Sequence, residues 1–212
     1  MKSGFLKELI DSLNEIENEN NLLINLRLRI IGYLVADDES IVEYVINCKI
    51  LNNFKNLLNC EDYSIRIEIA WILSNIILSH NIYLEYMIEL DLIKDCLKLL
   101  FNDNLKVKKE LIWIFVNIIS KNDLKFTNYL LENNFIEILP ELINFLDYDI
   151  IYLVLICIQN ILKNRPDLVY KFETVGILDK LELLQSCQNE EIINLSIILI
   201  DKYFDNDNNF TY

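Results

Sequence analysis

The chain has 212 residues, of which 53% are hydrophobic, with three Gly, two Pro and a formal net charge of −14. So few turn-forming residues argue against an all-β fold, and the acidity argues against nucleic acid as a partner, because phosphate binding needs clustered Lys and Arg. No uncharged run is long enough to span a bilayer, and the five scattered cysteines form no paired pattern, so we expect a soluble, intracellular protein without disulfides or a membrane contact.

Long apolar helices are predicted at regular intervals along the chain, over residues 23–36, 63–79, 105–120, 148–163 and 190–204. Two shorter amphipathic segments separate each pair, such as "SIVEYVINC" (40–48) and "ILNNFKNLLN" (50–59), with apolar residues at three- and four-residue spacing. Three helices in a repeat of about 42 residues predict an all-α fold, a right-handed superhelical solenoid of armadillo repeats. We assign residues 1–204 to one solenoid, with about four complete repeats after a partial N-terminal one, and residues 205–212 to a disordered polar tail.

Local signals support this segmentation. Ser40 and Glu43 have the spacing of a capping box, and Pro140 and Pro166 are expected near helix starts, where the missing N–H is tolerated. Gly176 lies at a junction between a first and a second helix, where a left-handed residue is expected, and Asn or Asp stands at several of the other junctions.

Two of the long helices carry the same three-residue pattern. "EIAWILSNII" (68–77) and "ELIWIFVNII" (110–119) each place a Glu three residues before a Trp and an Asn four residues after it. Such residues share one face of a helix, so Glu68, Trp71 and Asn75 form one stripe. Glu110, Trp113 and Asn117 form a second, 42 residues later.

These stripes predict a site for an extended basic peptide. An Asn amide can bond both the N–H and the C=O of a peptide backbone. Indole faces hold the stem of Lys or Arg and contact its cation, and the Glu supplies the opposite charge. The alternative is structural, because a Trp at helical spacing is usually core and a mid-helix Asn often bonds locally. The in-register repetition favours binding.

Three stretches give the chain a resemblance to the C-terminal half of importin-α, the armadillo adaptor for nuclear localisation signals. They are the paired Trp–Asn helices and the segments "LRIIGYLVADDESIVEYVINCKIL" and "GILDKLELLQSCQNEEIINLSIILIDKYF". The match covers about residues 24–204, as the family's sixth to tenth repeats. It implies a minor signal-binding site formed by Arg29, Val35, Glu68, Trp71, Asn75, Glu110, Trp113 and Asn117. Tyr33 stands where the family has Asn, which changes the outermost backbone clamp of this site.

The resemblance implies a nuclear import adaptor that binds basic localisation signals of cargo proteins and is found in cytoplasm and nucleus. It also implies an export receptor or a nucleoporin as partners. We expect no importin-β binding, because the family's basic N-terminal segment and its first repeats have no counterpart in this sequence. The alternative is an armadillo scaffold, or a degenerate or truncated importin-α paralogue, that binds another protein segment.

An enzyme is not expected, and neither a cofactor nor a metal site is predicted. The one histidine, His80, lies at the end of a long helix without an evident partner and is interpreted as a surface or capping residue. No phosphate loop, nucleophile motif or metal-ligand spacing is present.

Overall fold

The computed structural model describes residues 2–13, 20–144 and 147–205, and within these residues every regular element is a helix. The chain divides into two compact units, Met1–Asn117 and Ile118–Tyr212, with the boundary inside α8 (Leu105–Ser120). One continuous solenoid over residues 1–204 stays a prediction. The predicted tail lies outside the described residues, apart from Asp205.

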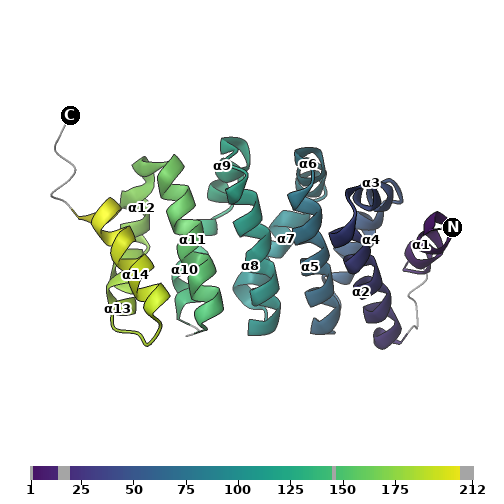
Figure 1. Cartoon of the computed structure of the whole chain (residues 1–212), viewed down its shortest axis with the longest axis horizontal. Coiled ribbons are helices and arrows are strands. Elements are labelled where there is room, and N and C mark those ends of the chain that lie inside the picture. Colours follow the sequence, from purple (N-terminus) through teal and green to yellow (C-terminus); the bar gives the residue numbers. More distant parts are fainter. Residues whose placement is uncertain (1, 14–19, 145–146, 206–212) are drawn as a thin grey trace. The chain divides into compact units, whose positions relative to one another are not determined.

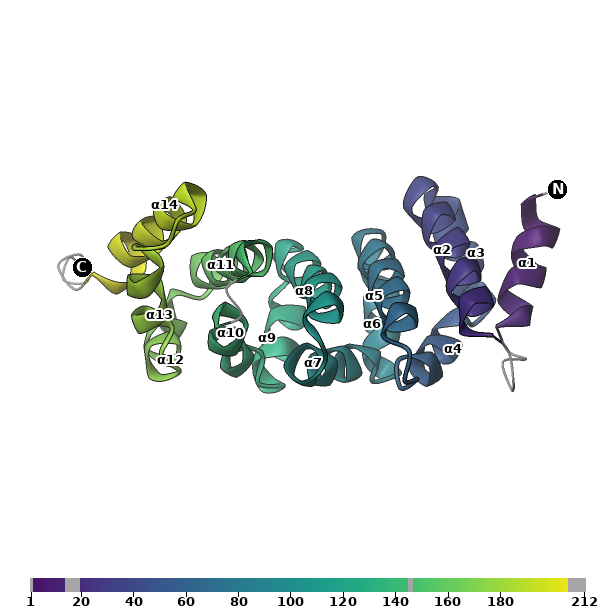
Figure 2. The same cartoon turned by 90° about the horizontal axis from the view of Figure 1, so that it is seen from below.

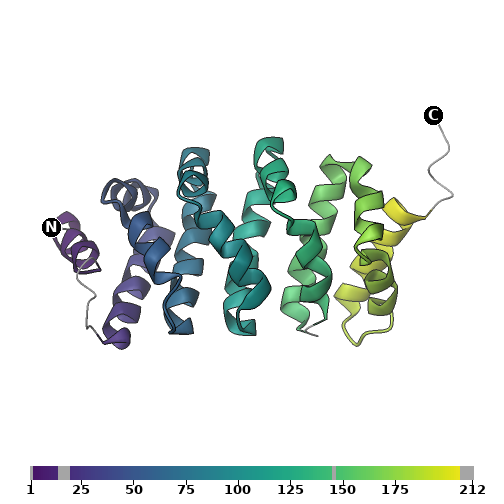
Figure 3. The same ribbon diagram turned by 180° about the vertical axis from the view of Figure 1, so that it is seen from behind.

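The first unit stacks its long helices side by side in one layer. These are α2 (Asn21–Asp37), α5 (Tyr63–Leu78) and the greater part of α8. The shorter helices are α3 (Glu39–Asn47), α4 (Ile50–Leu57), α6 (Asn81–Glu89) and α7 (Leu92–Asn102), and α1 (Lys2–Ser12) precedes α2. Figure 2 separates α4 and α7 from the layer of α2 and α5, and Figure 3 shows the unit from behind.

The second unit repeats the same order of helices. It contains α9 (Leu124–Glu132), α10 (Phe135–Ile143), α11 (Tyr148–Asn164), a 3₁₀ turn (Pro166–Leu168), α12 (Val169–Thr174), α13 (Ile177–Leu184) and α14 (Glu190–Leu199), which continues as a π-helical turn (Ile200–Phe204). In Figure 1, α11 and α14 lie beside each other. All five long helices therefore form where the sequence predicts them.

An Asn or Asp caps the start of every long helix. The side chains of Asn20, Asp62, Asn104, Asp147 and Asn189 each accept a hydrogen bond from a backbone N–H of the first turn. These capping residues recur at the interval of the repeat, so each repeat starts its long helix in the same way. The predicted capping box of Ser40 and Glu43 is wrong, since Asp38 caps α3 by accepting from the Ser40 N–H at 2.9 Å.

A single left-handed residue joins the first and second helices of each complete repeat. Gly176 has φ +84° as predicted, and its counterparts are Lys49, Asp91 and Asn134, with φ near +60°. Pro166 opens its 3₁₀ turn as expected. Pro140, in contrast, lies inside α10, because that helix begins at Phe135, earlier than the sequence indicated.

The core of the first unit is centred on α5, which packs on nearly all sides. Ile69, Ile72 and Ile76 are fully buried, as are the first residues of α4. All five cysteines of the chain are free, as expected. Burial raises the pKa of the Cys96 and Cys157 thiols, which keeps them protonated.

Candidate functional site

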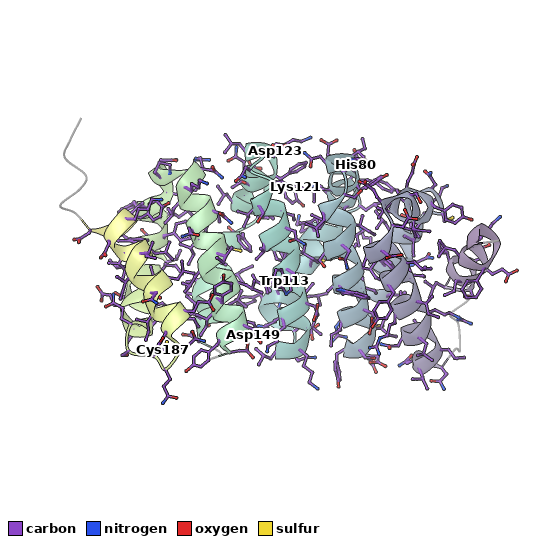
Figure 4. All side chains as sticks on the ribbon, in the orientation of Figure 1. His80, Trp113, Lys121, Asp123, Asp149 and Cys187 are labelled. Atoms are coloured by element: carbon purple, nitrogen blue, oxygen red, sulfur yellow. The ribbon has the colours of Figure 1, made fainter. Side chains whose placement is uncertain are left out.

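The exposed side of α5 and α8 carries the predicted stripes. Trp71 and Asn75 are half-buried on α5, whereas Trp113 of α8 is 46% exposed. Figure 4 shows Trp113 midway along α8. Because it is this exposed, Trp113 contributes less to the core than the buried residues of α8 do.

Three adjoining pockets bring together all nine predicted site residues. The indole pocket, of about 330 Å³, is lined by Trp71, Ser74, Asn75, Leu78, Glu110, Trp113 and Asn117. The Tyr33 pocket, also of about 330 Å³, is lined by Arg29, Tyr33, Ile67, Glu68, Trp71 and Glu110. The acidic pocket, of about 250 Å³, is lined by Val35, Ala36, Asp37, Asp38, Glu39, Val42, Asn75, Leu78 and Ser79.

Shared residues link these pockets into a row along α5. Trp71 and Glu110 line both the indole pocket and the Tyr33 pocket, and Asn75 and Leu78 line both the indole pocket and the acidic pocket. A ligand that follows α5 would therefore meet the three pockets in succession.

Trp71 is held between α2 and the open groove. A Cβ atom built on Gly32 would come within 2.3 and 2.7 Å of two Trp71 ring carbons, so only glycine leaves room for the indole at this point of α2. The neighbouring Tyr33 ring also meets Trp71 edge to face, with centroids 5.2 Å apart. Tyr33 itself is 64% exposed. It therefore extends the aromatic surface in place of an amide clamp.

The two Asn side chains are anchored differently. Asn75 donates to the Trp71 carbonyl in its own helix at 2.9 Å, whereas Asn117 donates across to the Ser74 carbonyl of α5 at 3.0 Å. Each bond uses one of two amide N–H groups, which leaves the second N–H and the carbonyl oxygen of the amide for a ligand. The local bond of Asn75 is the structural role that the sequence left open.

The two Glu residues of the stripes have different surroundings. Glu68 is buried and accepts from Arg29, through Nε at 2.9 Å and through the neighbouring Nη2. Glu110 is half-buried. Burial raises the pKa of the Glu110 carboxyl, the nearby Glu68 raises it further, and Lys109 opposes this. A ligand cation beside Glu110 would therefore stabilise its charged form, whereas Glu68 already has Arg29 as its partner.

The acidic pocket adds negative charge at the C-terminal end of α5. Its lining includes Asp37, Asp38 and Glu39 in sequence. Asp38 is engaged as the cap of α3, and Glu39 accepts from the Ser79 hydroxyl at 2.8 Å. The His80 ring lies 3.3 Å from the same Glu39 carboxylate and is 63% exposed, which agrees with its predicted surface position.

The sequence did not single out several residues of the site, and Gly32 and Ser74 are the most informative of them. Gly32 seats Trp71, and Ser74 lines the indole pocket and supplies the carbonyl that binds Asn117. A signal for Gly32 was available, because a glycine inside a helix is unfavourable unless another group approaches closely. The Arg29–Glu68 ion pair had no such signal, because it depends on the offset between neighbouring helices.

In the described part of the chain, no group of three or more His, Cys, Asp or Glu side chains is placed to hold a metal ion. Across the same residues, no helix combines the length and the apolar composition needed to cross a bilayer.

Comparison with known proteins identifies the fold. A family model described as an atypical Arm repeat matches residues 167–211, and no curated protein matches the chain. A designed armadillo repeat protein in complex with a (KR)4 peptide is 24% identical, with a TM-score of 0.81 over 93% of this chain and 81% of that one. Computationally designed armadillo repeat proteins for modular peptide recognition are 22% identical, with a TM-score of 0.82 over 93% of this chain and 82% of that one. The predicted all-α armadillo-repeat fold, with three helices in each repeat, is thereby confirmed.

Proposed function

We propose that this chain is a non-catalytic binding protein whose α5 groove holds an extended segment of another protein through Lys or Arg side chains. The observation that carries this proposal is the pair of pockets on either side of Trp71, both lined by Glu110. Each has an aromatic wall for an aliphatic stem and a carboxylate for the cation.

The spacing of the helices suits an extended main chain. Neighbouring helices pack roughly 8–10 Å apart, and an extended chain advances about 3.3 Å per residue, so one repeat matches about three residues. Asn75 and Asn117 can then bond the peptide backbone without reading its side chains.

The two pockets are not equivalent for a cation. Arg29 lines the Tyr33 pocket and its charge repels a second cation, although Glu68 neutralises part of it. The indole pocket has Glu110 and no Lys, Arg or His in its lining. We therefore assign the principal Lys or Arg of the ligand to the indole pocket, between Trp71 and Trp113.

The cellular role that we propose is that of an importin-α-like adaptor, which binds nuclear localisation signals and acts in cytoplasm and nucleus. The resemblance of the Trp–Asn helices supports this role, as does the net charge of −14, which favours basic partners. A designed protein of the same fold is known in complex with a Lys-Arg peptide. Import of a signal-bearing cargo in permeabilised cells, with and without this protein, tests the role separately from binding.

Binding itself is tested by titrating a fluorescent Lys/Arg peptide, and a matched peptide with Gln at the basic positions, against the protein. Asn75→Ala combined with Asn117→Ala removes two backbone bonds of about 0.5–1.5 kcal/mol each. The double variant should lose about five- to 150-fold in affinity if the two effects add.

Trp113→Ala should weaken binding comparably, because it opens the indole pocket. The control is Tyr170→Ala, which removes an aromatic ring that is 77% exposed on α12. Equal affinity of wild type and all variants would assign Trp113 and both Asn residues to the scaffold alone. The bond from Asn117 to Ser74 is the observation that favours that second candidate.

A further inference from the structure

The α2 helix exposes a run of large apolar side chains on one face. Leu22, Leu23, Leu26 and Ile30 are 62%, 48%, 46% and 41% exposed. A solenoid normally ends in a repeat with a polar outer face, because an apolar end would associate. Among the described residues, α1 packs against α2 and exposes Lys7, Glu8 and Asp11, but it leaves these four apolar side chains of α2 uncovered.

The other long helices show what normally covers this face. With the repeat spacing of 42, Leu23, Leu26 and Ile30 of α2 correspond to Ile65, Glu68 and Ile72 of α5. Those three residues are 1%, 4% and 0% exposed. They are buried because α2 packs on α5, where Gly32 would contact Trp71 and Ile72. The open face of α2 therefore has the position and composition of a surface that receives a preceding long helix.

The last long helix, α14, is open on the opposite side. Ile197 corresponds to Leu28, Ala70, Ile112 and Leu155 in the four earlier long helices, and all four of those residues are fully buried. Ile197 is 38% exposed, and its neighbour Ile198 is 51% exposed. Within each unit, a long helix packs on the next one at this position, as α2 does on α5 and α11 does on α14.

The register of the repeat predicts which residues of these two faces would meet. In the first unit, a residue of one long helix contacts the residue 39 positions later on the next long helix. Arg29 and Glu68 do so, as do Gly32 and Trp71. The counterparts of Arg29 and Glu68 are Ile198 of α14 and Leu26 of α2, which would form an apolar contact.

The second contact is electrostatic. The counterpart of Gly32 is the exposed Asp201, and the counterpart of Trp71 is Arg29. Arg29 already donates to Glu68 of α5, so Asp201 at the open end of α14 would add a second carboxylate beside this ion pair. The apolar contact is therefore the one that favours this packing, although neither contact reproduces the residues of the internal repeats.

We propose that two copies of this chain associate head to tail, with α14 of one copy packed on the open face of α2 of the other. Such an interface is heterologous, so each copy keeps one free end after pairing. The net charge of −14 makes copies repel, and salt screens this repulsion. Association therefore strengthens as salt rises, because the contact is mainly apolar.

Analytical ultracentrifugation over a concentration series tests this proposal with two variants of the full chain. Leu26→Glu changes only the α2 face and Ile198→Glu only the α14 face, and both sites are exposed enough to accept the change. Each variant alone should be monomeric, whereas wild type should associate. The mixture should form a one-to-one dimer and nothing larger, because the intact α14 face of Leu26→Glu meets the intact α2 face of Ile198→Glu.

Leu124→Glu is the matched control, since Leu124 is 49% exposed on α9 and belongs to neither face, and this variant should associate like wild type. Thermal unfolding checks that each variant is folded. A wild type that stays monomeric at all concentrations and salts would overturn the proposal. So would self-association of Ile198→Glu alone, which would indicate a symmetric pairing of α2 faces, or a mixture that fails to dimerise.

Discussion

Trp71 owes its orientation to Gly32, which has no side chain to oppose it. The indole lies where a Cβ of residue 32 would stand, and the Tyr33 ring meets it edge to face. A ring held by two neighbouring residues of α2 needs little further ordering when a ligand binds, which favours affinity. The wall between the indole pocket and the Tyr33 pocket is therefore preorganised by α2.

Gly32→Ala should destabilise the protein and weaken peptide binding together. Ala improves helix propensity by about 0.5–1 kcal/mol, but overpacking against Trp71 costs about 1–3 kcal/mol, so we expect a net loss in urea unfolding. The control is Gly4→Ala in α1, where an added Cβ meets nothing within 4 Å. A Gly32→Ala variant that is as stable as Gly4→Ala and binds peptide like wild type would show that the indole is not held in this way.

Glu110→Gln should affect stability and binding in opposite directions. The carboxyl pKa is raised in the folded state, so ionisation of Glu110 opposes folding as pH rises above the unfolded pKa. The Gln variant should therefore be slightly more stable than wild type at pH 7.

A bound cation favours the ionised form of Glu110, so wild-type affinity for a basic peptide should fall as pH drops below this raised pKa. Glu110→Gln should bind more weakly at pH 7 and lose most of this pH dependence, as measured by peptide titration from neutral to mildly acidic pH. An unchanged pH profile in the variant would remove Glu110 from the site.

At the scale of the helices, an ion pair whose side chains are largely covered joins two repeats of the first unit. Arg66 of α5 bonds both carboxylate oxygens of Asp103, at 2.6 and 2.8 Å, and also donates to the Cys60 carbonyl. The side chains of Arg66 and Asp103 are only 13% and 5% exposed. This bidentate pair fixes the turn before α5 against the turn before α8.

Asp103→Ala should cost about 3–5 kcal/mol in denaturant unfolding, because it leaves the Arg66 charge largely covered and without its partner. The matched control is Asp167→Ala at the more exposed Arg165–Asp167 pair, which should cost about 1 kcal/mol or less. Equal losses at the two sites would mean that the Arg66 pair is hydrated and contributes like a surface pair.

The periodic features of these helices could be predicted from the sequence, because apolar spacing and repeated Trp and Asn residues are local patterns. The long helices, the left-handed Gly176 and the six residues of the two Glu–Trp–Asn stripes follow from such patterns, whereas Arg29, Tyr33 and Val35 were assigned from the resemblance to importin-α. Lys49 in a left-handed turn could not be predicted in this way, since its conformation is imposed by the packing of α3 and α4. The pairing of Arg29 with Glu68 depends on the helix offset, which no single segment encodes.

At the scale of the whole molecule, the charge of −14 acts on every association of the chain. Attraction of a basic peptide is electrostatic and is screened by salt, since the Debye length falls from about 30 Å at 0.01 M to about 10 Å at 0.1 M. Repulsion between copies is screened by the same ions.

Peptide affinity should therefore fall with rising salt while self-association strengthens. Titration and sedimentation of the same preparation over one salt series measure both. Parallel trends in the two measurements would show that they do not depend on the opposing charge effects described above.

A crystal structure of the chain with a Lys/Arg peptide tests the central claim most directly. The account predicts an extended peptide along α5, with its backbone bonded to the Asn75 and Asn117 amides. One Lys or Arg stem should lie between Trp71 and Trp113, with its cation near Glu110. A peptide bound elsewhere on the chain, with the indole pocket empty, would contradict the account.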